Sequence, residues 1–181
     1  MSRYGLVISG FGGQGVLFGG YLFAYAAMLE GKKVTWVPSY GVEMRGGTAH
    51  CSIQISEQEI NAPLIEEPNA LVALNRPSYE KFSPTINGKG VVFFNKSLTE
   101  KAPQANGLCV VSIEASDEAK RLGDIRVANL IILGALVQYS KVLDIDNLYR
   151  ALEKILPPHR HDSIEINLKA LKKGYECDLA L

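Results

Sequence analysis

Apolar positions near the amino terminus form two short runs around one long run. Residues 4–9 are apolar and end at a glycine cluster, which is typical of a strand buried on both faces of a parallel sheet. Residues 16–30 are apolar nearly all round and stop at Gly31, which predicts an interior helix with a glycine just past its end. Val34 to Val37 predicts a second strand, which Pro38 ends. The chain therefore begins with a β-α-β unit.

The pattern after this unit first alternates and later becomes helical. Thr48 to Ser56 alternates polar and apolar residues, as a half-exposed strand does, and we expect a turn at Glu57 and Gln58 toward a partner strand near Ile60. Short apolar runs then predict further strands, and the residues from Ser116 onward show helical periodicity. The predicted strands are 70–74, 91–95 and 108–113, and the predicted helices are a short charged one from Ser116 and longer ones at 127–139, 145–156 and 163–176.

These elements together predict an α/β fold. We expect a three-layer α/β/α arrangement with a mixed, mostly parallel sheet and a Rossmann-like first β-α-β unit. A single domain over residues 1–181 fits the length, because no internal repeat, low-complexity tract or linker interrupts the chain. The doublet of Pro157 and Pro158 is interpreted as a break between two helices.

Charge and cysteine content narrow the class of partner. Nineteen basic residues balance nineteen acidic ones, so no long-range field draws in nucleic acid or an anionic membrane surface. The apolar stretch 16–29 is shorter than the roughly 20 residues that span a bilayer, and glycines interrupt the sequence before it. Cys51, Cys109 and Cys177 stand far apart, which suits the cytoplasm and cannot supply the clustered thiolates of an iron–sulfur centre. We expect a cytoplasmic protein with neutral or protein partners.

A glycine-rich motif follows the first predicted strand. It matches G-x-G-x-x-G between a strand and a helix, where glycines permit a tight turn and let backbone N–H groups approach an anion. The alternative is that the glycines only let the helix pack closely on the sheet. Conventional NAD binding is disfavoured, because the first carboxylate after the second strand is Glu43, several residues into the next loop. The predicted cofactor-binding residues are Gly10, Gly12, Gly13, Gln14 and Gly15.

Two spaced motifs carry a resemblance to a known family. Residues 8–16 read ISGFGGQGV and residues 39–48 read SYGVEMRGGT. Together they resemble the gamma subunits of 2-oxoacid:ferredoxin oxidoreductases. The Y-G-x-E-x-R-G-G motif makes the resemblance specific, because a general dinucleotide fold does not demand it. The match covers almost the whole chain, since it continues through 127–129, 133–136, Asn167, Ala170, Leu171 and Gly174.

The resemblance implies a chain that works only within a larger enzyme. Such enzymes catalyse oxidative decarboxylation of a 2-oxoacid with coenzyme A as co-substrate, and they pass electrons to ferredoxin or flavodoxin. Thiamine diphosphate, Mg²⁺ and 4Fe-4S clusters are then expected in alpha and beta partner subunits, with a ferredoxin-like delta subunit as a further candidate. A short gamma chain is most similar to the 2-oxoglutarate type, while the pyruvate and branched-chain types stay open. The isolated chain is expected to bind none of these cofactors and to be inactive.

The loop after the second strand supplies the remaining candidate contacts. Glu43 and Arg45 lie two residues apart in a glycine-rich segment. They either shape the loop, through a local ion pair or backbone hydrogen bonds, or contact a ligand or subunit. The predicted ligand or subunit contacts are Ser39, Tyr40, Glu43, Arg45, Gly46 and Gly47.

Other constellations support no catalytic or metal site. The segment from His159 to Asp162 has two histidines at i and i+2 but lacks a third ligand of suitable spacing, so we expect an exposed turn before the last helix. A free-standing nucleotide-binding oxidoreductase and a non-catalytic phosphate-ligand-binding module remain the alternative functions.

Overall fold

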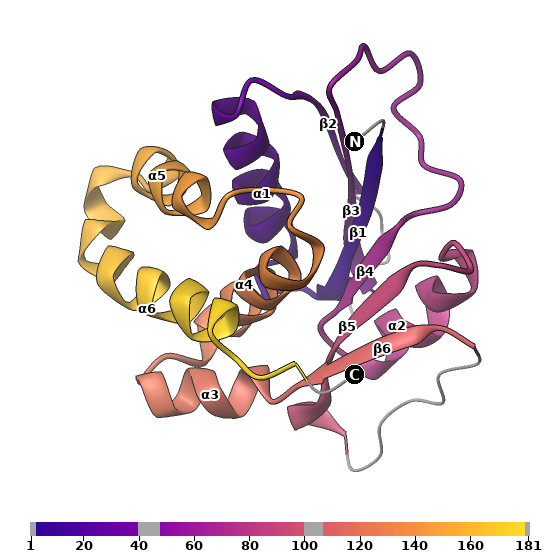
Figure 1. Ribbon diagram of the computed structural model, residues 1–181. Helices are drawn as coiled ribbons and strands as arrows, with labels where there is room; N and C mark the ends of the chain where they lie inside the picture. Colours follow the sequence, from indigo (N-terminus) through magenta and orange to yellow (C-terminus); the bar gives the residue numbers. More distant parts are fainter. Residues whose placement is uncertain (1–2, 40–47, 100–106, 180–181) are drawn as a thin grey trace.

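The computed structural model describes residues 3–39, 48–99 and 107–179, and its centre is one six-stranded sheet. The strand order is β2-β3-β1-β4-β5-β6 (Figure 1). The strands are β1 (Tyr4–Phe11), β2 (Lys33–Ser39), β3 (Thr48–Ser56), β4 (Ala70–Ala73), β5 (Val91–Asn95) and β6 (Cys109–Ile113).

Five of the six strands run in the same direction. The pairs β1–β4, β4–β5 and β5–β6 are parallel, whereas β3 pairs antiparallel with both β1 and β2. The predicted mixed, mostly parallel sheet is confirmed. The expected β-α-β unit is present with its two strands parallel, but β3 lies between β1 and β2 in the sheet.

The predicted hairpin after β3 is wrong. The edges of β3 are taken by β1 and β2, so the turn at Glu57 and Gln58 leads to no partner strand near Ile60. Residues 57–69 instead form an irregular segment that packs against the sheet. The Nε2 atom of Gln54 on β3 holds this segment by donating to the carbonyl oxygens of Ala62 and Leu64, at 3.0 and 2.9 Å.

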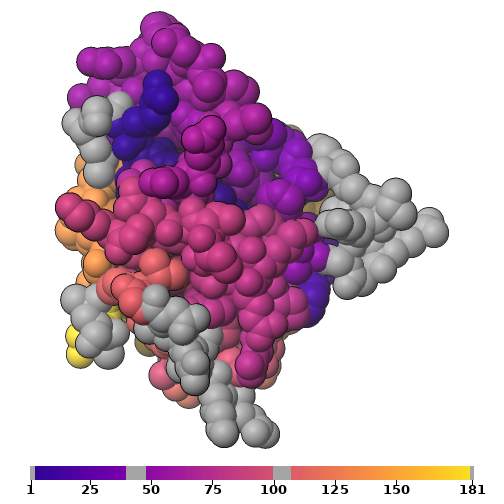
Figure 2. Space-filling model, turned by 90° about the vertical axis from the view of Figure 1, so that its right-hand side faces the viewer, coloured from indigo at the N-terminus to yellow at the C-terminus, as the bar shows by residue number. Residues whose placement is uncertain are grey.

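Helices cover the two faces of the sheet unequally. The α1, α3, α4, α5 and α6 helices lie on one face and α2 lies on the other (Figure 1), so the three-layer arrangement is confirmed. Figure 2 looks onto the α2 face, where the purple and magenta segments that follow β3 and β4 cover the sheet. The α-helices are α1 (Val16–Leu29), α2 (Arg76–Phe82), α3 (Ala115–Leu122), α4 (Ala128–Ser140), α5 (Ile145–Ile155) and α6 (Ile164–Tyr175), and the short 3-10 helices are η2 (Ser83–Thr85), η3 (Lys96–Leu98), η4 (Ile125–Val127) and η5 (Pro158–Ser163).

The helices follow the sequence pattern to within a residue at their ends, except for α2, which the pattern did not predict. Asn75 caps α2, since its Oδ1 accepts a hydrogen bond from the backbone N–H of Ser78 at 2.9 Å. A capping asparagine with Pro77 in the first turn is a recognised helix start, but the helix is too short for its apolar period to stand out. Within the described ranges, none of the helices is long and apolar enough to cross a membrane.

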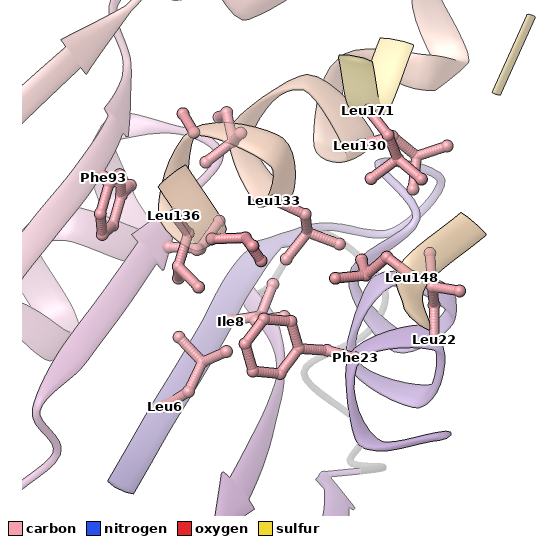
Figure 3. Close-up of a cluster of buried hydrophobic side chains, with 14 of the residues drawn as sticks. Leu6, Ile8, Leu22, Phe23, Phe93, Leu130, Leu133, Leu136, Leu148 and Leu171 are labelled. Atoms are coloured by element: carbon pink, nitrogen blue, oxygen red, sulfur yellow. The ribbon is translucent and has the colours of Figure 1, made fainter. Parts of the chain in front are cut away.

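The main core lies between the sheet and the layer of five helices (Figure 3). The α4 helix is enclosed there, since residues 129–137 are all buried. Gly134 of α4 faces Gly174 of α6, and a side chain at either position would meet the backbone of the other helix. The two helices therefore pack at a distance that only glycine permits. The core residues labelled in Figure 3 are Leu6, Ile8, Leu22, Phe23, Phe93, Leu130, Leu133, Leu136, Leu148 and Leu171.

Candidate ligand site at the glycine loop

The carboxyl ends of β1 and β2 lie at one edge of the sheet, together with the start of β3. Phe11 at the end of β1 pairs with Thr48, and Ser39 at the end of β2 pairs with His50. Ser39 and Thr48 therefore both lie at the edge that carries the glycine loop. Ser39 is placed at this edge, whereas the other predicted contacts of this segment lie outside the described residues: Tyr40, Glu43, Arg45, Gly46 and Gly47.

The glycine loop turns the chain sharply from β1 into α1. Gly13 and Gly15 have φ values of 90° and 74°, in the left-handed region that favours glycine. Gly10 is buried at the end of β1, where a Cβ atom would lie 2.8 Å from Oε1 of Gln14 and 3.0 Å from Cβ of Leu74. Gly12 and Gly13 are exposed at the tip of the turn. The motif thus combines an exposed backbone turn at Gly12 and Gly13 with tightly packed glycines on either side, Gly10 and Gly15.

The side chain of Gln14 fastens this loop to the next strand of the sheet. Its Oε1 accepts hydrogen bonds from the backbone N–H of Phe11 at 2.7 Å and from Nδ2 of Asn75 at 2.9 Å. Its Nε2 donates to the carbonyl oxygen of Leu74 at 3.4 Å. The structure therefore gives Gln14 a role in positioning the loop, and its predicted contact with a ligand stays a prediction.

Asn129 at the start of α4 holds the other side of the loop. Its Nδ2 donates to the carbonyl oxygen of Gly15 at 3.0 Å, and the residue is buried. A Cβ atom on Gly15 would collide with this amide nitrogen. Asn129 belongs to the family resemblance, but its contact with Gly15 could not be predicted, because the two residues are 114 positions apart and no periodicity connects them.

A hollow of 430 Å³ opens beside the glycine loop, and three helices begin at its wall. Their N-cap residues are Gly15 for α1, Val127 for α4 and Ser163 for α6, and none of these three residues caps its helix with a side-chain hydrogen bond within the described chain. The start of a helix carries partial positive charge and backbone N–H groups without intrahelical partners. At α4 and α6 some of these groups already have acceptors, because the N–H groups of Ala128, Leu130 and Ile164 donate to the Ile125 carbonyl oxygen, Asn129 Oδ1 and the His161 carbonyl oxygen. The hollow is therefore suited to an anionic group such as phosphate.

Charged side chains of both signs also line the hollow. Arg126 binds the Asp124 carboxylate through Nε at 2.9 Å and Nη2 at 2.7 Å, and these hydrogen bonds hold the pKa of Asp124 below its ordinary value. Nη1 of Arg126 is not part of this ion pair, and the side chain is 80% exposed. Arg160 and Asp162 add a second pair of opposite charges to the wall. Because these formal charges cancel, the preference for an anion rests on the helix starts and on the donors of the arginines.

The segment from His159 to Asp162 is the exposed turn that was expected before the last helix. It forms most of η5, and Nε2 of His161 lies 3.1 Å from the carbonyl oxygen of Leu156. In the described parts of the chain, His, Cys, Asp and Glu side chains nowhere gather in a group of three that could hold a metal ion. This turn forms part of the wall of the hollow and adds the side chain of Arg160 to it.

Comparison with known proteins identifies relatives along nearly the whole sequence. Residues 5–177 match the family described as pyruvate ferredoxin/flavodoxin oxidoreductase. The ketoisovalerate oxidoreductase subunit VorA of Methanothermobacter thermautotrophicus is 32% identical over 169 residues, which are 93% of this chain and 35% of VorA. The 2-oxoglutarate synthase subunit KorC of Methanocaldococcus jannaschii is 33% identical over 176 residues, which are 93% of this chain and 90% of KorC.

A solved structure agrees with the fold. The gamma subunit of the keto/oxoacid ferredoxin oxidoreductase from Geobacter sulfurreducens is 30% identical and superposes with a TM-score of 0.85, covering 97% of this chain and 96% of that one. The chain spans about a third of the length of the VorA relatives, but it matches nearly all of KorC and of the Geobacter subunit. The resemblance carried by the two glycine-rich motifs is confirmed, and the chain belongs to the pyruvate ferredoxin/flavodoxin oxidoreductase family.

Proposed function

We propose that this chain is the gamma subunit of a multi-subunit 2-oxoacid:ferredoxin oxidoreductase in the cytoplasm. The complex would decarboxylate a 2-oxoacid oxidatively to an acyl-coenzyme A and pass the electrons to ferredoxin or flavodoxin. The observation that carries this proposal is the match to KorC and to the Geobacter gamma subunit, which extends over nearly the full length of both partners in each comparison.

The proposed substrate is 2-oxoglutarate. Percentage identity alone does not separate the substrates, since the ketoisovalerate and 2-oxoglutarate relatives are 32% and 33% identical. The proposal of 2-oxoglutarate rests on the resemblance of a short gamma chain to KorC, of which this chain spans 90%. Match length does not separate the substrates either, since the chain also spans 94% of the indolepyruvate subunit IorB and 97% of the pyruvate oxidoreductase subunit PORC. Pyruvate and ketoisovalerate are the competing substrates that an assay must separate.

We place the redox cofactors in the partner subunits, alpha, beta and a candidate delta. Cys51 is buried beneath α1, Cys109 lies on β6 with its Sγ 3.8 Å from the hydroxyl of Tyr139, and Cys177 follows α6. These separate positions do not fit a 4Fe-4S cluster, which needs four converging ligands. The proposal therefore gives thiamine diphosphate, Mg²⁺ and the clusters to other chains.

We further propose that the hollow beside Gly13 and Gly15 receives phosphate groups of coenzyme A. The start of α1, Arg126 and Arg160 offer donors to phosphate, and the starts of α4 and α6 add partial positive charge. Ser39 and Thr48, the described residues on either side of the segment that contains Arg45, lie at the same edge of the sheet as the glycine loop. The competing interpretation is that the loop only packs α1 on the sheet through Gln14 and Asn129.

The function is tested by expressing this chain with the candidate alpha, beta and delta chains of its source. The purified complex should reduce ferredoxin or a viologen dye in a coenzyme A-dependent reaction, with the highest kcat/KM for 2-oxoglutarate among 2-oxoglutarate, pyruvate and ketoisovalerate. A preference for another 2-oxoacid would correct the substrate alone. Turnover of NAD(P) by the purified single chain would instead favour a free-standing oxidoreductase.

The coenzyme A site is tested in the same complex with Arg126→Ala. A charge-assisted hydrogen bond is worth about 1.5–3 kcal/mol, and the exposure of Arg126 places it at the lower end, so the KM for coenzyme A should rise about tenfold. Arg76→Ala is the matched control, because Arg76 is also exposed and ion-paired but lies on α2. Equal KM values for the two variants would contradict a phosphate contact at the hollow.

A further inference from the structure

The outward face of α1 carries no charge. The sequence contains no Asp, Glu, Lys or Arg between Arg3 and Glu30, a stretch that includes the whole helix. Tyr21 and Met28 are 42% and 59% exposed, although a helix that is apolar all round is normally buried on every side. An apolar face in this position indicates a surface that another molecule covers.

Neighbouring helices show that this feature is particular to α1. The α4 helix has a similar all-round apolar sequence, and burial explains that sequence, because α6, α3 and α1 enclose the helix. The outer helices α5 and α6 carry ionic side chains, such as Arg150 and Glu153 on α5 and Lys169 and Lys172 on α6. In Figure 1, α1 lies between α5 and the sheet, at the end of the helical layer that is next to β2. Its apolar face therefore has no explanation within the described chain.

This face carries a preassembled aromatic surface, in which Tyr21 and Met28 are exposed and their neighbours are half-buried. We call it the α1 patch: Phe18, Tyr21, Tyr25 and Met28 on α1 with Trp36 on β2. The ring of Tyr21 lies 5.4 Å from that of Trp36 and 6.1 Å from that of Tyr25, measured between centroids. Aromatic side chains held by such contacts lose little conformational freedom on binding, and they are enriched among the residues that dominate binding energy at interfaces.

We propose that the α1 patch is the docking surface for a partner polypeptide that corresponds to the part of VorA not matched by this chain, about two thirds of its length. In those relatives the region matched by this chain is only 35% of one longer polypeptide, so the remaining sequence is covalently attached to it. In KorC the same region is nearly the whole chain. In an enzyme of the KorC kind, only a stable interface keeps the two parts together, and an uncharged aromatic surface would supply it. This inference rests on the proposed function.

The position of the patch adds support. Phe18 is half-buried; it lines the hollow beside the glycine loop and is also the first residue of the α1 patch. A partner seated on the α1 patch therefore reaches the mouth of the candidate ligand site. That arrangement fits an enzyme in which this chain and a larger subunit hold one ligand between them.

The test measures binding of this chain to the separately purified chain of its source that is similar to the rest of VorA. The variants are Tyr21→Gln and Met28→Lys; the lysine falls in the last turns of α1, where a positive charge suits the helix dipole. Leu64→Gln is the matched control, because Leu64 is 76% exposed but lies in the 57–69 segment on the other face of the sheet. Melting temperatures of the isolated variants verify that each one folds.

Both α1 variants should lower the affinity at least tenfold, while Leu64→Gln binds like the wild type. Hydrogen exchange of α1 should also slow in the wild-type complex. Wild-type affinity of both α1 variants in an active, 2-oxoacid-dependent complex would refute the docking surface and leave the proposed function intact. A wild-type chain that neither binds the partner nor supports 2-oxoacid oxidation would refute both. Self-association that depends on Tyr21, with unchanged partner binding, would assign the patch to a second copy and overturn the proposal.

Discussion

Replacing Gly15 by alanine should destabilise the protein through two separable effects. The φ value of Gly15 is 74°, and the left-handed conformation costs an L-amino acid roughly 1–2 kcal/mol. The added Cβ atom would also collide with Nδ2 of Asn129, which now donates to the carbonyl oxygen of Gly15 at 3.0 Å. Displacing this buried amide from its partner costs about 1–3 kcal/mol more.

The two effects together should lower the free energy of unfolding by about 2–5 kcal/mol, a large fraction of the stability of a typical domain. In a domain of this size each kcal/mol lowers Tm by roughly 2–4 °C, so the expected decrease is about 4–20 °C. Thermal and urea unfolding of the isolated chain, followed by circular dichroism, would measure it. The far-ultraviolet spectrum before unfolding should match that of the wild type.

Gly31→Ala is a close control for the backbone effect. Gly31 has a φ value of 75°, but a Cβ atom there would have no atom within 4 Å, so only the conformational cost applies. The difference between the two variants isolates the collision with Asn129. In the double variant Gly15→Ala/Asn129→Ala the collision is absent, so its destabilisation should be less than the sum of the single ones. If Gly15→Ala costs no more than Gly31→Ala, the Asn129 contact does not hold the loop and the reasoning fails.

Three further predictions concern the pKa values of Cys51 and Asp124 and the function of Arg45. Burial raises the pKa of Cys51 to about 12, so a thiol reagent at pH 8 should label Cys109 and Cys177 first, and labelling of Cys51 in the folded chain would contradict its burial. Arg126 lowers the pKa of Asp124, so the carboxylate stabilises the fold above its unfolded pKa of about 3.9, and this contribution is lost as the pH falls. The difference in unfolding free energy between wild type and Asp124→Asn should therefore shrink from pH 7 to pH 3. A constant difference would count against the ion pair. Arg45→Lys and Arg45→Ala should both weaken assembly or raise the KM for coenzyme A without changing the stability of the isolated chain, because lysine keeps the charge but lacks the planar fork; wild-type kinetics in both would leave Arg45 without a functional contact.

Local sequence patterns predicted where the helices and strands lie in the sequence, but not which strands are neighbours in the sheet. The uninterrupted apolar run of α1 and the alternation of β3 are properties of residues adjacent in sequence, and both elements were found. The insertion of β3 between β1 and β2 depends on pairing between segments that are far apart, which periodicity does not encode. Proximity in sequence suggested that residues near Ile60 would pair with β3. Both edges of β3 instead pair with strands that precede it, β1 and β2.

The same limit applies to the candidate site. The G-x-G-x-x-G motif located the loop, since its geometry is set by adjacent glycines. Its attachment through Asn75 and Asn129 was not predictable, because both residues reach it from other elements. The exposed face of α1 was also missed. Its uninterrupted apolar sequence predicts burial, and only the arrangement of α4, α5 and α6 reveals which helix is covered by this chain and which is not.

Phe18 connects the two proposals physically. Because it lines the hollow and also belongs to the α1 patch, a subunit docked on the patch would form part of the wall around any ligand in the hollow. A ligand that contacts both chains binds the complex more tightly than either chain alone. Linkage then requires that the same ligand strengthen the association of the two chains by an equal factor. Coenzyme A would therefore stabilise the assembly it serves, and the free chain, with its hollow open and its aromatic face uncovered, would hold it only weakly.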